Sequence, residues 1–255
     1  MLSIITVTYN NFNELIKTIN SIPISASIES IVINGGQCEK TLDYLKSFSG
    51  RSVSEKDDGI ADAFNKGVTL ASGKYIMFLN SGDELIDNSY PEKAIKILEL
   101  DRNISFVHSN LILADAGNNQ LYMKPQMKSL GRGMPYLHPT MIVKKELFNR
   151  IGYFNTTLKV AMDFDWVARL VKNNFIGSYY SNSFVVKMDG EGKSIVQESI
   201  AMRECYSILK ANALLNPKNI FGFSLRFTLY LTRVLMAKIG LKKILVSMKK
   251  IKHSQ

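Results

Sequence analysis

Short stretches rich in apolar residues recur in the first eighty residues of the chain, at positions 2–8, 30–33 and 75–79, and a further short strand is expected near 51–54. Each run has the length of a buried strand and is too short to favour a helix. Segments with helical spacing of their apolar residues separate the runs, at 12–22, 40–48 and from 60 onward. Strands that alternate with helices in this way predict an α/β fold, in which a mixed, mostly parallel sheet carries helices on both faces.

The pattern continues less regularly through the rest of the chain. Asp57 or Asp58 is placed to cap the helix that starts near Ile60. We expect strands at 104–107 and 136–143 and a hairpin turn at 115–119. Further helices are expected at 91–100, 144–150, from 161 and at 197–215, where Asn216-Pro217 ends the last of them.

Polar side chains follow the ends of the predicted strands. Since right-handed connections bring the carboxyl ends of parallel strands to one edge of a sheet, these side chains should converge there. A nucleotide base, a ribose and a metal-bound pyrophosphate would need such a cluster of amides and carboxylates. The residues concerned are Asn10, Asn34, Asp57, Asp58 and Asp83.

Asp83 closes the turn Asn80-Ser81-Gly82-Asp83, which follows the apolar run at 75–79. A carboxylate at the tip of a buried strand is well placed to hold a cation or a phosphate-bearing ligand. The same turn-prone residues also suit a plain strand-to-helix turn with Asp83 as a local cap. The acidic pair Asp57-Asp58 upstream favours the ligand site.

Four segments, in this order, resemble the family 2 glycosyltransferases. The likeness runs from residue 2 to about 195, and the most similar subgroup carries Ser-Gly-Asp and is common in bacterial surface-polysaccharide synthesis. It implies a GT-A (Rossmann-like) fold and inverting transfer from a nucleotide sugar. The segments are Val7-Thr8-Tyr9-Asn10-Asn11, Ile33-Asn34-Gly35-Gly36, the acidic stretch 54–67, and Phe78-Leu79-Asn80-Ser81-Gly82-Asp83.

The resemblance implies a pocket for a nucleotide-diphosphate sugar, with a UDP-sugar as the expected donor. Asp83 would ligate a Mg²⁺ or Mn²⁺ ion that bridges the diphosphate, since hard cations often sit on one or two carboxylates plus phosphates. The other residues implied around the donor are Thr8, Tyr9, Asn10, Asn34, Asp57, Asn65, Lys66 and Ser81.

Asp163 is the candidate catalytic base. Together with Asp165 it lies in the first turn of a predicted helix, where acidic residues also complement the helix dipole. Apolar spacing buries one face of that helix and leaves Asp163 at the mouth of the site. The resemblance implies that Asp163 deprotonates the acceptor hydroxyl. Asp165 is expected to pair with Arg169 one helical turn later.

His138 and Lys193 complete the predicted site. His138 has two interpretations, a packed histidine or, as the resemblance implies, a residue beside the active site. Lys193 lies in the glycine-rich stretch 189–194, a type of loop that closes over phosphates, and could reach the diphosphate.

The net charge of +10 belongs to the C-terminal segment. Ten lysines and arginines follow Glu204 and no Asp or Glu does, so the first 204 residues are neutral. Residues 234–251 alternate apolar residues with lysines at helical spacing, which fits an amphipathic helix on an anionic membrane surface. A helix packed on the catalytic domain or in a homodimer contact fits the same pattern. Nucleic acid is not expected as a partner, because no binding motif accompanies the charge.

These patterns divide the chain into a GT-A domain at 1–200 and a basic helical extension at 201–255. The expected activity is sugar transfer to a hydroxyl of a glycan or lipid-linked acceptor. The alternative is a non-catalytic nucleotide- or glycan-binding module with the same fold.

Two distant cysteines suggest no disulfide framework, and the first residues lack the features of a signal peptide. We therefore expect a cytoplasmic protein at the inner face of the cell membrane.

Overall fold

The computed structural model describes residues 1–114, 119–126, 129–189 and 197–238. Its strands are β1 (Leu2–Thr8), β2 (Ile28–Asn34), β3 (Arg51–Ser54), β4 (Tyr75–Phe78), β5 (Glu84–Leu85), β6 (Ile104–Ala114), β7 (Gln120–Met123), β8 (Ile142–Lys144) and β9 (Ile176–Asp189). Its helices are α1 (Phe12–Ser21), α2 (Glu39–Lys46), α3 (Ile60–Leu70), α4 (Tyr90–Leu100), α5 (Glu146–Ile151), α6 (Met162–Lys172), α8 (Glu198–Ala211) and α9 (Pro217–Lys238), with short 3₁₀ turns η1 (Leu130–Arg132) and η2 (His138–Thr140).

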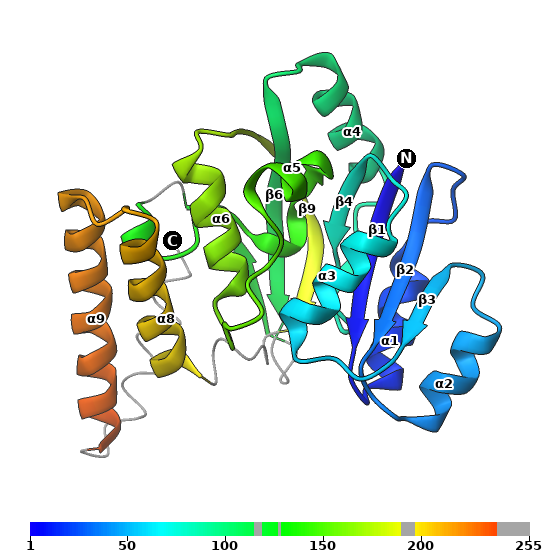
Figure 1. The fold of residues 1–255 in the computed structure, drawn as a ribbon, viewed down its shortest axis with the longest axis horizontal. Coiled ribbons are helices and arrows are strands. Elements are labelled where there is room, and N and C mark those ends of the chain that lie inside the picture. Colours follow the sequence, from blue (N-terminus) through cyan, green and yellow to red (C-terminus); the bar gives the residue numbers. More distant parts are fainter. Residues whose placement is uncertain (115–118, 127–128, 190–196, 239–255) are drawn as a thin grey trace.

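The strands in the described ranges form one sheet, in the order β3-β2-β1-β4-β8-β6-β9-β5, with β7 paired to β6. Pairing is parallel from β3 through β2 and β1 to β4, and antiparallel where β8 joins β4 and β6. Figure 1 shows α8 and α9 at the end of the molecule opposite α2 and β3. The predicted mixed α/β fold with additional C-terminal helices is confirmed.

Strand β1 shows why the sheet is covered on both faces. Its alternate side chains point to opposite sides. Leu2 and Ile4 join a buried cluster that contains Tyr90 and Leu98 of α4. Ile5 joins a second cluster on the other face, with helices α3, α5 and α6. All seven residues of β1 are buried, Ser3, Thr6 and Thr8 included, which explains why Leu, Ile and Val supply the rest of this central strand.

The prediction of a strand over 136–143 is wrong in its first half. Residues His138–Thr140 form the 3₁₀ turn η2, and only Ile142–Lys144 is a strand. Pro139 lacks the N–H that a central strand would use. The Thr140 hydroxyl replaces a backbone acceptor for the neighbouring strand β6, because the N–H of Ser109 in β6 donates to Thr140 Oγ1 at 3.0 Å.

The long strand β9 was not predicted, and β6 extends beyond the predicted 104–107 to Ala114. The two pair in parallel with shifts in register around Ser109 and Asn110. Serines, asparagine and glycine interrupt the apolar alternation of 176–189, so no strand pattern is visible there. The predicted turn at 115–119 falls almost wholly outside the described residues, although β6 and β7 on either side pair antiparallel.

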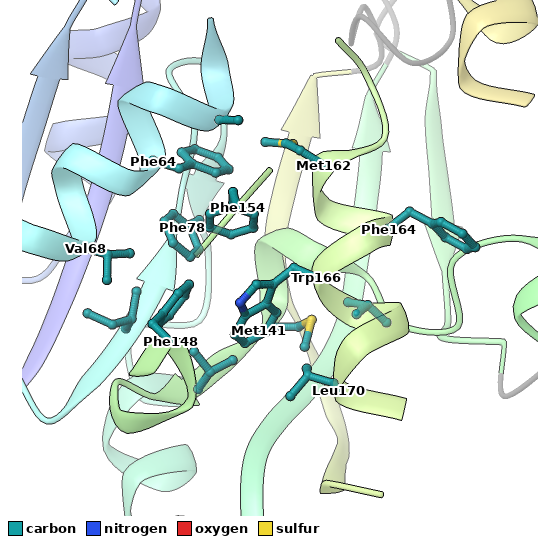
Figure 2. Close-up of a cluster of buried hydrophobic side chains, with 14 of the residues drawn as sticks. Phe64, Val68, Phe78, Met141, Phe148, Phe154, Met162, Phe164, Trp166 and Leu170 are labelled. Atoms are coloured by element: carbon teal, nitrogen blue, oxygen red, sulfur yellow. The ribbon is translucent and has the colours of Figure 1, made fainter. Parts of the chain in front are cut away.

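Aromatic side chains of α3, β4, α5 and α6 form one buried cluster. Figure 2 shows Phe64 of α3, Phe78 of β4, Phe148 of α5, Trp166 of α6 and Phe154, from the loop before α6, gathered in it. The ring centroids of Phe64 and Phe78 are 4.4 Å apart, and those of Phe148 and Trp166 are 4.8 Å apart. Such ring pairs add directional contacts to burial. The cluster therefore fixes α3 relative to α6.

The C-terminal helices pack against this cluster and against each other. Cys205 and Leu209 of α8 belong to the same buried cluster as α6, and Tyr206 contacts Phe223 of α9. The predicted helix at 197–215 ends earlier, at Ala211, because Ala213 adopts a left-handed φ of 56°. Pro217 begins α9 instead of merely ending α8, in keeping with the preference of proline for a first helical turn. Across the part of the chain that the structure describes, no helix is both long and apolar enough to span a membrane.

Candidate active site

A cavity of about 440 Å³ lies at the carboxyl ends of β1, β2 and β3. This volume is within the range of small-molecule sites, about 300–1,000 Å³. Its position agrees with the predicted edge of the sheet. The lining residues are Tyr9, Asn10, Gly35, Gly36, Gln37, Leu42, Ser54, Glu55, Lys56 and Asp57.

The loop after β1 forms one wall of this cavity. Asn10 adopts a left-handed φ of 56°, which asparagine tolerates better than most residues. Its Oδ1 accepts hydrogen bonds from the backbone N–H groups of Gln37 (2.8 Å) and Cys38 (3.1 Å). Tyr9 is 68% exposed and also lines the cavity, whereas Thr8 is buried and donates to Asn11. Asn10 therefore ties the loop after β1 to the loop after β2.

Asn34 lies below the cavity and is not part of its lining. Its side chain is fully buried, and Nδ2 donates to Gly36 O (3.0 Å) and to Ser54 Oγ (2.8 Å). Its Oδ1 accepts from the N–H of Gly36 at 3.0 Å. Both the oxygen and the nitrogen of the Asn34 amide are therefore hydrogen-bonded, and they fix the turn at Gly35 and Gly36 that lines the cavity.

Asp57 faces the same glycine turn. A Cβ on Gly35 would overlap the Oδ2 of Asp57, so the carboxylate occupies space that only glycine leaves open. The predicted capping of α3 by Asp57 or Asp58 is wrong, because Gly59 is the N-cap and no side chain makes a capping hydrogen bond to the helix. Gly59 has a φ of 112°, and its N–H donates to Oδ1 of Asp57. The carboxylate thus holds the loop before the helix and not the helix itself.

Gly35→Ala is expected to weaken, by about tenfold, the binding of the nucleotide that the resemblance implies, with little change in melting temperature, because the new methyl group displaces the Asp57 carboxylate while the backbone φ stays allowed. Isothermal titration with UDP measures this. In an Asp57→Ala background the same glycine change should have almost no effect. Additive losses in the double variant would contradict a route through Asp57.

Asn65 and Lys66 of α3 have partners within the protein. The Asn65 amide donates to Phe154 O and accepts from Phe154 N, each at 2.9 Å. Lys66 forms ion pairs with Glu55 (2.9 Å) and Asp62 (3.1 Å), and the bond to Glu55 raises its pKa. Asn65 therefore anchors the loop that precedes α6, and Lys66 fixes a charged residue of the cavity wall.

The turn Asn80-Ser81-Gly82-Asp83 continues from β4 and runs beside the end of β1. The N–H of Ser81 donates to Val7 O at 3.2 Å, and Gly82, with a φ of 104°, donates to Thr18 Oγ1 at 2.9 Å. Oδ2 of the buried Asp83 accepts from the N–H of Asn80 at 3.1 Å. Neighbouring contacts on α1 and β1 thus determine the shape of the turn.

Two oxygens of this turn are buried without a hydrogen-bond partner, Oδ1 of Asn80 and Oγ of Ser81. Buried side-chain oxygens without a partner are rare in folded proteins, and a bound ion or water is one of the groups that can satisfy them. Together with the Asp83 carboxylate they form a set of oxygen donors, the kind that Mg²⁺ or Mn²⁺ prefers. No group of three or more His, Cys, Asp or Glu able to hold a metal occurs among the described residues. The turn therefore fits a cation that takes its remaining ligands from phosphate and water.

Asp163 lies at the second position of α6, half-buried, and its Oδ1 accepts from the N–H of Phe164 at 2.7 Å. His138 is close enough for the Asp163 charge to oppose the effect of burial, which lowers the His138 pKa. The imidazole stacks on Phe78 and Phe64, with centroid distances of 5.4 and 5.9 Å. His138 is therefore packed on the aromatic cluster and also lies near Asp163.

Asp165 faces away from this region and pairs with Arg169 at 2.9 Å, as the spacing predicts. Arg169 also donates to the backbone oxygens of Ile151, Gly152 and Tyr153. The pair thus fastens α6 to the end of α5. Lys193 lies outside the described residues.

Several cavity residues were missed by the sequence analysis. Gln37, Glu55 and Lys56 line the cavity, yet none was singled out. Their positions in the sequence could have identified them, because Gln37 follows the glycine turn and Glu55-Lys56 follow the predicted strand at 51–54. Glu204, which contacts the loop before Asp163, had no comparable signal in the sequence.

Comparison with known proteins gives a consistent assignment. The profile of "Glycosyl transferase family 2" matches residues 3–159, so Asp163 lies just beyond its end. An uncharacterized glycosyltransferase of Rickettsia prowazekii is 25% identical over 202 residues, which cover 73% of this chain and 63% of that protein. The chain thus spans a little under two thirds of the length of this relative.

Two solved structures share the fold. Residues 1–349 of S. aureus TarS, in complex with UDP-GlcNAc, match with a TM-score of 0.64 and 17% identity over 84% of this chain and 65% of that one. The mannosyltransferase PcManGT from Pyrobaculum calidifontis, with GDP-Man and Mn²⁺, matches with a TM-score of 0.59 and 14% identity over 98% and 79%.

Proposed function

The chain belongs to glycosyl transferase family 2, and we propose that it transfers a sugar, with inversion, from a UDP-sugar to a hydroxyl of a glycan or lipid-linked acceptor. A role in bacterial surface-polysaccharide synthesis is part of this proposal. The observation that carries it is the arrangement of a nucleotide-sized cavity and the turn with orphaned oxygens along one sheet edge. The TarS and PcManGT structures, which share the fold, hold UDP-GlcNAc and GDP-Man, and this supports a nucleotide sugar as the donor class.

The reaction needs a base, a leaving group and a way to stabilise charge. The Asp163 carboxylate takes the proton of the acceptor hydroxyl as its oxygen attacks the anomeric carbon. The bond from that carbon to the diphosphate breaks, and the nucleoside diphosphate leaves with the electron pair. Asp83, Asn80 and Ser81 would hold a divalent cation, whose chemistry is to neutralise the charge that develops on the diphosphate.

A ligand screen followed by a transfer assay tests this function. Melting temperatures with UDP-, GDP- and dTDP-sugars, each with Mn²⁺, should rise for UDP-sugars, since a ligand at 100 times its Kd adds about 2.7 kcal/mol of stability. Mass spectrometry should then detect UDP release and glycosylated acceptor. Binding of a UDP-sugar without hydrolysis or transfer to any acceptor would support the non-catalytic binding module instead.

We also propose that α9 rests on an anionic membrane, at the inner face of the cell membrane. Large apolar side chains of α9 are exposed although the helix is packed on α8 and η1, among them Phe221 (72%), Leu235 (61%) and Leu229 (51%). The helix contains no acidic residue, and five lysines lie beyond its last residue, outside the described ranges. A nearby anionic surface attracts each such cation by about 1 kcal/mol.

Binding to vesicles is expected to depend on both features of this segment. The protein should sediment with vesicles that contain phosphatidylglycerol and much less with neutral phosphatidylcholine vesicles. Phe221→Ser combined with Leu235→Ser should reduce sedimentation by about tenfold, because two exposed apolar anchors are lost. If those substitutions instead abolish a homodimer in sedimentation velocity and leave vesicle binding unchanged, the exposed face belongs to a dimer contact.

A further inference from the structure

Glu204 of α8 contacts the chain immediately before α6. Its Oε1 accepts from the N–H of Lys159 at 2.8 Å. Its Oε2 accepts from the N–H of Val160 at 3.0 Å and from that of Ala161 at 2.8 Å. One carboxylate thus binds three consecutive backbone N–H groups. Hydrogen bonds to an ionised acceptor are among the stronger ones in proteins.

The three N–H groups that Glu204 binds lie at the start of α6. Ala161 is the N-cap of α6, and no side chain caps the helix in the usual way. Unsatisfied N–H groups and the positive end of the helix dipole both favour a negative charge at this point. Glu204 supplies that charge from another helix, 43 residues away from Ala161 in sequence. Asp163 follows Ala161 by two residues, on the first turn of the same helix.

The surroundings of Cys205 show that the two carboxylates lie in one region. This thiol is buried between α8 and its neighbours, and burial raises its pKa. The charges of Asp163 and Glu204 raise it further, while Arg226 of α9 opposes them. Arg226 also reaches the Cys205 sulfur at 3.8 Å. The helices α8 and α9 therefore form part of the environment of Asp163.

We infer that Glu204 is a positioning residue, which holds the backbone of 159–161 and thereby orients Asp163 toward the acceptor hydroxyl. The inference rests on the proposed role of Asp163 as base. The inference also gives α8 a role in the site, since its Glu204 binds the backbone segment that leads into α6, the helix that carries Asp163. Misplacement of a reacting group by about 1 Å can cost about a hundredfold in rate.

Glu204→Gln tests this directly, because the amide is nearly isosteric but has only one acceptor oxygen. The NH₂ group of the glutamine, itself a donor, would face backbone N–H groups that now bond to a carboxylate oxygen, so those bonds would be lost. We expect kcat to fall about tenfold to a hundredfold while KM for the donor stays unchanged, since the donor cavity lies at β1–β3. Glu204→Asp keeps the carboxylate and should be less impaired. Glu198→Gln on the same helix, which loses only its pair with Arg233, should keep full kcat.

Hydrogen exchange gives a readout that does not depend on activity. Amides 159–161 should exchange about tenfold faster in Glu204→Gln than in the wild-type protein, with little change at α3. Unchanged exchange there, or wild-type kcat in Glu204→Gln, would overturn the inference. An equal loss of kcat in Glu198→Gln would also overturn it, since general destabilisation of α8 would then suffice. A wild-type protein that transfers no sugar from any donor would instead refute the proposed function, whatever the exchange data show.

Discussion

Asp163→Asn is expected to lower kcat by about 10²- to 10⁴-fold, the usual contribution of a positioned general base. The amide keeps the shape of the side chain and can still accept the hydrogen bond from Phe164, so α6 should remain in place. It cannot take a proton from the acceptor hydroxyl at neutral pH. Steady-state kinetics with the UDP-sugar found by screening, together with the Kd of UDP by titration, would separate chemistry from donor binding.

Asp165→Asn is the matched control for this prediction. It makes the same chemical change two residues along the same helix and breaks the ion pair with Arg169. We expect a lower melting temperature and a kcat close to that of the wild-type protein. If Asp163→Asn retains full activity, Asp163 is not the base. If both variants lose activity equally, the loss reflects the stability of α6.

Asp83→Asn is expected to weaken UDP binding in Mn²⁺ about a hundredfold, equivalent to about 2.7 kcal/mol, because the turn loses the carboxylate that would hold the cation. The asparagine Oδ1 can still accept the N–H of Asn80, so the turn should keep its shape. Titrations of UDP with Mn²⁺ and with EDTA measure the effect. In the variant the two curves should nearly coincide, whereas in the wild-type protein they should differ widely.

Uridine provides the internal control, since it lacks the phosphates that a cation would bridge. Its affinity should be the same in both proteins. Asp87→Asn, in the loop that leads from β5 to α4, removes an acid that bonds Ser89 and Ser183 and should leave the metal effect intact. An undiminished effect of Mn²⁺ in Asp83→Asn would place the cation on other residues.

The predicted elements that agree best with the structure are those with one dominant local cause. Strands β1 and β3 have the predicted bounds, and helix α3 begins at the predicted residue. For β1 the reason is burial on both faces, which favours a strand rich in Leu, Ile and Val. The i,i+4 pair of Asp165 and Arg169 also needs only helical geometry.

The incorrect predictions have causes that lie far away along the chain. His138 sits in a 3₁₀ turn because Thr140 bonds to Ser109, and β9 forms because β6 offers an edge to pair with. Asn34 follows a strand as predicted, and its amide is hydrogen-bonded to Gly36 and Ser54 within the protein. Sequence pattern shows that a polar residue follows a strand. It does not show whether the protein itself already satisfies that residue.

Local pattern was therefore enough to predict the α/β class, the sheet edge that carries the site, and the Asn80-Ser81-Gly82-Asp83 turn, because side-chain period and turn chemistry act over a few residues. Packing determined the rest. Phe64 and Trp166 meet through an aromatic cluster, and Glu204 reaches a backbone segment more than forty residues earlier. Such contacts depend on which surfaces the folded chain brings together, and a single sequence contains no local signal for them.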